Sequence, residues 1–186
     1  MPSFAITPLT DHTGAEVIGL DFTQPIDIET RAGLNHAFAE RHVLVMRDQR
    51  FTPEQFKAAA QLFGELQPHD KKERHVAGHP DVCRNLPPPG IHPLVRTHPF
   101  TGRKCLYVSK GECEGIEGMA KDEALALIDE LMRHATQKKY EYRHKWRHGD
   151  WVLWDNRSVM HQANPDYDMT QRRYLYRLLL EGETPV

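Results

Sequence analysis

Residues 43–46, Val-Leu-Val-Met, form an uninterrupted apolar run. Such runs are typical of strands that are buried on both faces of a sheet. Directly before this run, Leu34, Ala37 and Phe38 lie three and four residues apart along the chain, which predicts an amphipathic helix over residues 30–41. We therefore expect a sheet with at least one buried strand, and a helix that leads straight into that strand.

A second helix is predicted to begin at Thr52. The Thr52 side chain can cap the helix, Pro53 fits its first turn, and Gln55 lies three residues after the cap, as a capping box requires. Gly64 is a natural end for this helix. Four residues are expected to form its apolar face: Phe56, Ala59, Ala60 and Phe63.

The rest of the chain adds further strands and one more helix. Short β-like runs predict strands at 4–6, 16–20, 105–108 and 173–180. The spacing of Leu125, Ile128, Leu131 and Met132 predicts a third helix. Alternation over 140–146, then Gly149-Asp150 and the run 151–154, predicts a β-hairpin. These patterns predict a mainly β fold with flanking α-helices.

Composition narrows the class of protein. The 186 residues suit a single domain, and 24 Lys+Arg against 26 Asp+Glu give a formal net charge of −2. That balance argues against a nucleic-acid binder or a polybasic membrane module. No apolar run approaches the ~20 residues of a membrane span, and the N-terminus does not resemble a signal peptide. We therefore expect a cytoplasmic protein with no nucleic-acid or membrane partner.

Chemically useful side chains gather near the C-terminus. His161 follows the predicted strand 151–154, and Arg172, Arg173 and Arg177 come shortly after it. Imidazole is a good ligand for Fe(II), Zn or Cu, and guanidinium binds a carboxylate through two parallel hydrogen bonds. On a strand, Arg173 and Arg177 would share a face and Arg172 would lie on the other. The pattern fits a site for a metal and an anion, and it also fits a solvated, ion-paired surface.

Three ordered blocks resemble the taurine/2,4-dichlorophenoxyacetate dioxygenase (TauD/TfdA) family, which uses non-haem Fe(II) and 2-oxoglutarate. The C-terminal block is WDNR at 154–157 with His161 and the later arginines. The central block is HPLVRTHP at 92–99, followed by TGRK and LYV. The N-terminal block comprises GAEV at 14–17, GLD at 19–21, RDQ at 47–49 and FGEL at 63–66.

The resemblance implies an incomplete double-stranded β-helix, or jelly roll, and assigns roles to four residues. His161 is the distal histidine of the 2-His-1-carboxylate iron site and therefore the metal-binding catalytic residue. Arg173, with Arg172 as the alternative, holds the far carboxylate of 2-oxoglutarate, and Arg177 meets the anionic group of the substrate. The implied reaction uses O2 to hydroxylate a sulfonate, sulfate ester or aryloxyalkanoate and releases succinate and CO2. The resemblance also allows a homo-oligomer.

The other two iron ligands of the family come from an H-x-D motif, which this chain lacks in its usual setting. His79-Pro80-Asp81 matches the letters, but proline would restrict the strand edge on which the ligands sit. We therefore expect one dioxygenase domain over 1–186 with an apparent internal gap near residues 82–86. Either a segment is missing from the sequence of an active enzyme, or the protein has an internal deletion and is an inactive binding or scaffold module.

Other conspicuous residues have structural interpretations. His92 and His98 each precede a proline and are expected to make hydrogen bonds within a loop. Asp155 and Asn156 are expected to fix a turn beside the iron site rather than to bind metal. A zinc hydrolase built from the 12 histidines is a rival interpretation, but no HExxH-type spacing supports it.

Overall fold

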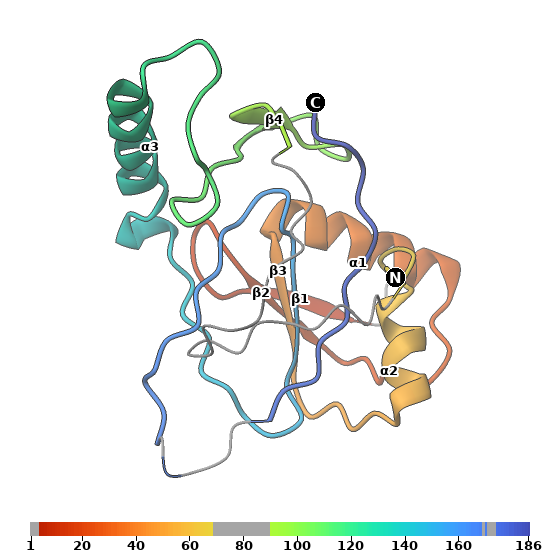
Figure 1. Cartoon of the computed structure of the whole chain (residues 1–186). Helices are drawn as coiled ribbons and strands as arrows, with labels where there is room; N and C mark the ends of the chain where they lie inside the picture. The colour runs from red at the N-terminus through yellow and green to blue at the C-terminus, as the bar shows by residue number, and fades with distance from the viewer. Residues whose placement is uncertain (1–3, 69–89, 169, 171–173) are drawn as a thin grey trace.

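A computed structural model describes residues 4–68, 90–168, 170 and 174–186 (Figure 1). Its strands form two sheets. One sheet has the order β1-β2-β3-β6, with β1 at Ala5–Pro8, β2 at Ala15–Ile18, β3 at Val43–Met46 and β6 at Trp151–Trp154. The other sheet is the hairpin of β4 (Val95–Thr97) and β5 (Lys104–Leu106). The helices are α1 (Ile28–Arg41), α2 (Pro53–Ala60) and α3 (Lys121–Ala135), and a 3-10 turn, η1, spans Lys138–Tyr140.

The strand β3 is the interior strand that its composition predicts. It pairs in parallel with β2 and antiparallel with β6, and all four of its residues are buried. Leu44 lies opposite Ala15 on one side and Leu153 on the other. Parallel pairing with β2 requires a crossover, and α1 provides it between the two strands. The predicted helix at 30–41 and the buried strand at 43–46 are confirmed.

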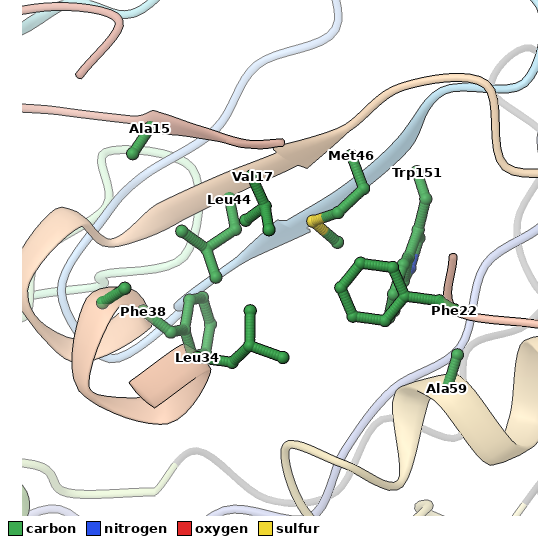
Figure 2. Close-up of a cluster of buried hydrophobic side chains, with 10 residues drawn as sticks. Ala15, Val17, Phe22, Leu34, Phe38, Leu44, Met46, Ala59 and Trp151 are labelled. Atoms are coloured by element: carbon green, nitrogen blue, oxygen red, sulfur yellow. The ribbon is translucent and has the colours of Figure 1, made fainter. Parts of the chain in front are cut away.

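The main hydrophobic core lies between this sheet and the helices α1 and α2. Figure 2 shows Leu34 and Phe38 of α1 pointing toward Leu44 and Val17 of the sheet. At the other end of the cluster, the rings of Trp151 and Phe22 meet edge to face, with centroids 5.0 Å apart. The core therefore extends along β3 and β6, and β6 is the strand that leads into the predicted functional segment.

The helix α2 begins as the sequence predicts. The Thr52 side chain accepts a hydrogen bond from the Gln55 amide, and the Gln55 side chain accepts one from the Thr52 amide. The helix ends at Ala60 rather than continuing to Gly64, because the next residues tighten into turns closed by short-range hydrogen bonds. Phe63 still packs on Trp151, with ring centroids 6.0 Å apart.

The predicted hairpin of 140–146 with 151–154 is wrong. Residues 141–147 form no strand, and β6 pairs with β3 instead. The physical reason is the buried carboxylate of Asp150. Its Oδ2 accepts hydrogen bonds from the Arg147 amide at 2.7 Å and from the side chain of Arg47, and it lies 3.0 Å from His144 Nε2. The segment therefore curls around one acceptor rather than extending beside β6.

The predicted strand at 173–180 is also wrong over most of its described length. Residues 174–179 lie in no strand, and Leu180 makes an isolated antiparallel bridge with Leu66. A strand requires a neighbour that pairs with its backbone groups, and segment 65–67 supplies one only for residues 179–181. The predicted strand at 105–108 is found as β5, which ends at Leu106.

A buried ion cluster joins the two sheets. His98 follows β4 and is 1% exposed, and Asp155 follows β6 and is 3% exposed. His98 Nε2 lies 3.0 Å from Asp155 Oδ2. Arg157 donates to both carboxylate oxygens of Asp155, each at 2.7 Å, and its guanidinium also lies 3.6 Å from Glu183. The hairpin and the end of β6 therefore meet at the Asp155 carboxylate, and the C-terminal segment joins them through Arg157.

The electrostatic balance at Asp155 favours the charged form. Burial opposes ionisation and would raise the pKa of this carboxyl group, but hydrogen bonds from Arg157 and His98 outweigh burial. The pKa therefore lies below its ordinary value of 3.8. A folded-state pKa below that of the unfolded chain means that ionised Asp155 stabilises the fold at neutral pH.

Among the described residues, no helix combines the length and the apolar character that crossing a membrane requires.

Replacing Leu44 with alanine tests the core. Leu44 is fully buried, so the substitution should remove apolar contacts and leave a cavity, and it should lower the free energy of unfolding by roughly 2–5 kcal/mol. Chemical denaturation measures this change. The matched control is Ile28→Ala at a site that is 88% exposed, and it should change the unfolding free energy little. Equal effects of the two substitutions would contradict the proposed core.

Replacing Asp155 with asparagine tests the ion cluster. The substitution removes the charge that His98 and Arg157 face, so it should cost about 1.5–3 kcal/mol of unfolding free energy at pH 7. The stabilisation by ionised Asp155 is complete above its unfolded pKa and is lost as pH falls through the lower folded pKa. The difference between wild type and variant should therefore shrink below about pH 4. A difference that does not depend on pH would show that the charge of Asp155 is not the cause.

Candidate functional site

The turn after β6 is held by Asp155 from both its backbone and its side chain. The Asp155 carbonyl accepts hydrogen bonds from the amides of Ser158 and Val159, each at 3.0 Å. Oδ1 of Asp155 accepts a hydrogen bond from the Arg157 amide at 2.9 Å. The prediction that Asp155 fixes a turn is confirmed.

A contact with the start of β3 fixes the other side of this turn. The Asp155 amide donates to the carbonyl of His42 at 2.9 Å, and Ser158 Oγ lies 2.9 Å from His42 Nδ1. His42 ends α1 in the left-handed region, with φ at 65°. Because His42 is the residue between α1 and β3, the turn is attached to the most buried part of the sheet.

His161 lies a few residues beyond the turn and rests against Trp154, the last residue of β6. Their ring centroids are 4.9 Å apart, with the ring planes at 45°. The Trp154 indole nitrogen donates to Asn156 Oδ1 at 2.9 Å, which fixes the orientation of the indole ring. The ring of His161 therefore has a defined neighbour even though the residue is exposed.

The electrostatic surroundings of His161 favour its neutral form. Partial burial lowers the pKa of the imidazole, the positive charge of Arg177 lowers it further, and Glu112 acts in the opposite direction. Neutral imidazole carries the lone pair that a metal requires. Arg177 is thus close enough to His161 for its charge to act on the imidazole.

The other predicted site residues are placed only in part. Arg172 and Arg173 lie outside the described residues, as do the letters H-x-D at 79–81. Arg177 is described, but it lies in no strand. The preference for Arg173 over Arg172 stays a prediction, because both residues lie outside the described part of the chain.

The fit to an iron site is partial. His161 offers one imidazole, but no group of three or more His, Cys, Asp or Glu side chains that could hold a metal ion occurs in the described part of the chain. The described residues therefore supply a single candidate ligand beside a positive charge. They could bind an anion next to His161, and they do not by themselves assemble a facial triad.

Sequence reasoning missed the pairing of His98 with Asp155. It predicts loop hydrogen bonds for His98, and these are present, because the amides of Phe100 and Thr101 both donate to His98 Nδ1 at 3.3 Å. The contact with Asp155 spans 57 residues and leaves no local pattern. The available signal was that both residues fall within the family-like blocks HPLVRTHP and WDNR.

Comparison with known proteins identifies the family. The family model described as "Taurine catabolism dioxygenase TauD, TfdA family" matches residues 5–85 and 79–179. The alpha-ketoglutarate-dependent 2,4-dichlorophenoxyacetate dioxygenase of Burkholderia sp. (strain RASC) is 46% identical over 99 residues, which are 53% of this chain and 33% of that protein. The alpha-ketoglutarate-dependent sulfate ester dioxygenase of Pseudomonas putida is 37% identical over 95 residues, 51% of this chain and 31% of that protein. The chain thus spans about a third of the length of these relatives.

Solved structures show the same relationship. The crystal structure of AAD-2 in complex with Mn(II) and N-oxalylglycine aligns with a TM-score of 0.82 and 27% identity over 98% of each chain. A taurine dioxygenase from Burkholderia xenovorans aligns with a TM-score of 0.73 and 27% identity, over 84% of this chain and 81% of that one. Because the family model covers most of its length, this chain belongs to the TauD, TfdA family of taurine catabolism dioxygenases.

Proposed function

We propose that this chain contributes to an Fe(II)- and 2-oxoglutarate-dependent dioxygenase that hydroxylates a small anionic molecule. The observation that carries the proposal is His161, which is held against Trp154 at the end of β6 with the charge of Arg177 acting on it. The family match and the names of the relatives support the same reaction class. The two sheets with helices outside them are proposed to be part of a jelly roll.

Each residue has a proposed role. His161 supplies one imidazole to iron, and Arg173, with Arg172 as the alternative, pairs with the far carboxylate of 2-oxoglutarate. Arg177 attracts the anionic group of the substrate toward His161. Bound iron, 2-oxoglutarate and O2 would supply the oxidation of a C–H bond, with release of succinate and CO2. The protein positions the anions and holds the imidazole neutral.

The proposed substrate class is sulfonate, sulfate ester or aryloxyalkanoate. The relatives are named for 2,4-dichlorophenoxyacetate, for sulfate esters and, in Saccharomyces cerevisiae, for sulfonates. These groups differ in shape but share a negative charge, which a guanidinium recognises. The charge of Arg177 beside His161 is therefore consistent with all three. Location in the cytoplasm and self-association stay predictions.

We further propose that residues 1–186 belong to one domain with an internal gap near 82–86. The family model matches in two stretches that meet at 79–85, and the curated relatives are about three times as long as the part that matches. A segment that carries the H-x-D ligands would fall at this point. The relatives named above are dioxygenases, so the comparisons give no support to an inactive binding module.

Turnover tests the proposed reaction. The full-length natural protein, with any segment that this sequence lacks, should consume O2 and form succinate when it is supplied with Fe(II), 2-oxoglutarate and a panel of sulfonates, sulfate esters and aryloxyalkanoates. His161→Ala should abolish succinate formation, Arg173→Ala should raise the 2-oxoglutarate concentration required, and Arg177→Ala should raise the KM of the organic substrate. The exposed residues His36 and Arg50 provide controls, and their alanine variants should retain activity. Unchanged turnover in the His161 and Arg173 variants would refute these roles.

The mass of the intact protein from its natural source tests the gap. A mass well above 21.5 kDa is expected if the sequence lacks a segment of the enzyme. A mass of 21.5 kDa, together with no succinate formation, would instead favour an internal deletion and an inactive relative.

A further inference from the structure

His98 is a buried titratable side chain outside the residues assigned to the reaction. It lies at the end of β4, in the hairpin sheet, whereas His161 follows β6 of the larger sheet. Its side chain is 1% exposed and faces a carboxylate that is 3% exposed. Burying a polar pair this deeply costs free energy unless its hydrogen bonds are made. The hydrogen bonds of His98 therefore indicate what the side chain does in the fold.

The hydrogen bonds around His98 define its tautomer. Two backbone amides, those of Phe100 and Thr101, point at Nδ1 from 3.3 Å, so Nδ1 accepts and carries no proton. The proton of the neutral ring is therefore on Nε2, which lies 3.0 Å from Asp155 Oδ2 and donates to it. The loop between β4 and β5 thus presents a donor of fixed direction to Asp155.

Asp155 uses its two oxygens for different tasks. Oδ1 accepts hydrogen bonds from the amide and Nε of Arg157, which close the turn after β6. Oδ2 accepts hydrogen bonds from Arg157 Nη2 and from His98. The Arg157 contacts are local, two residues along the chain, whereas the His98 contact comes from another sheet. His98 is therefore the side-chain donor to this carboxylate that comes from outside its own turn.

Asp155 in turn stands between Trp154 and the segment that carries His161. The indole of Trp154 meets the ring of His161 at a centroid distance of 4.9 Å. A rotation of the Asp155 carboxylate would break the hydrogen bonds that Oδ1 accepts from the amide and Nε of Arg157, and would so disturb the turn through which the chain runs toward His161. The position of the His161 imidazole thus depends on the hydrogen bond between His98 and Asp155.

We propose that His98, as its Nε2–H tautomer, is a positioning residue for His161 and acts through Asp155. His98 contacts neither of the reactants and contributes only by holding the turn that sets the Trp154–His161 pair. The importance of this position rests on the proposed role of His161 as an iron ligand. Its test uses the metal-free chain and no turnover, so the two proposals can fail separately.

NMR of the 15N-labelled chain tests this inference. Ring nitrogen spectra of the wild-type protein should show His98 protonated on Nε2 alone. In His98→Leu, the indole signal of Trp154 and the ring signals of His161 should move, while the indole signal of buried Trp151 should stay in place. In His98→Gln, the side-chain amide can donate to Asp155, so the wild-type signals should largely return. The matched control is His92→Gln, an exposed histidine of the same HPLVRTHP block, which should leave Trp154 and His161 unmoved.

Three results would overturn the inference. The first is a folded His98→Leu variant with unchanged Trp154 and His161 signals. The second is a His98→Gln variant in which the Trp154 indole signal moves as far as it does in His98→Leu. A His98→Gln variant in which the Trp151 signal moves as far as the Trp154 signal counts equally against the inference, because it reports a general loss of structure. The third applies even if the leucine variant does not fold: a wild-type His98 ring protonated on Nδ1, or on both nitrogens, contradicts the proposed donor.

Discussion

The buried carboxylate of Asp155 connects the segments that surround the proposed site. Burying a charge is costly unless several donors surround it, and Asp155 has Arg157 on both oxygens and His98 on one. These donors come from the turn after β6 and from the β4-β5 hairpin. The C-terminal segment joins through Glu183, which pairs with Arg157 and with buried Arg96. The cost of burying the charge is offset only when all these segments are in place, so the contact fixes their arrangement.

The strand β6 connects the hydrophobic core to the proposed site. Its first residue, Trp151, is buried among the aromatic rings of the core, and its last, Trp154, lies against His161. Because β3 holds β6 along its whole length, Trp154 has little freedom to move. The imidazole thus lies next to a strand that pairs with the fully buried β3, although His161 itself is exposed.

Local chemistry explains which elements could be predicted from the sequence. The capping box at Thr52 and Gln55 and the apolar run at 43–46 are determined by neighbouring residues, and both are confirmed. The prediction of a hairpin at 140–146 is wrong because the conformation of that segment depends on a hydrogen bond from a distant residue, Arg47, to Asp150. The prediction of a strand at 173–180 is wrong over most of its described length because a sequence pattern does not show whether a neighbouring strand is present to pair with it. Of the proposed site, the motifs predict His161 and Arg177, and their roles stay predictions. The His98–Asp155 pair could not be predicted, because it is a long-range contact without a periodic signature.

The central claim is that the turn held by Asp155 places His161 against Trp154 before any metal or substrate binds. A nuclear Overhauser effect between the Trp154 indole protons and the His161 ring protons, measured on the metal-free chain, tests it most directly. The account predicts a clear cross-peak, because the ring centroids are 4.9 Å apart. Absence of that cross-peak in a folded sample, with both rings showing the shifts of free side chains, would contradict it.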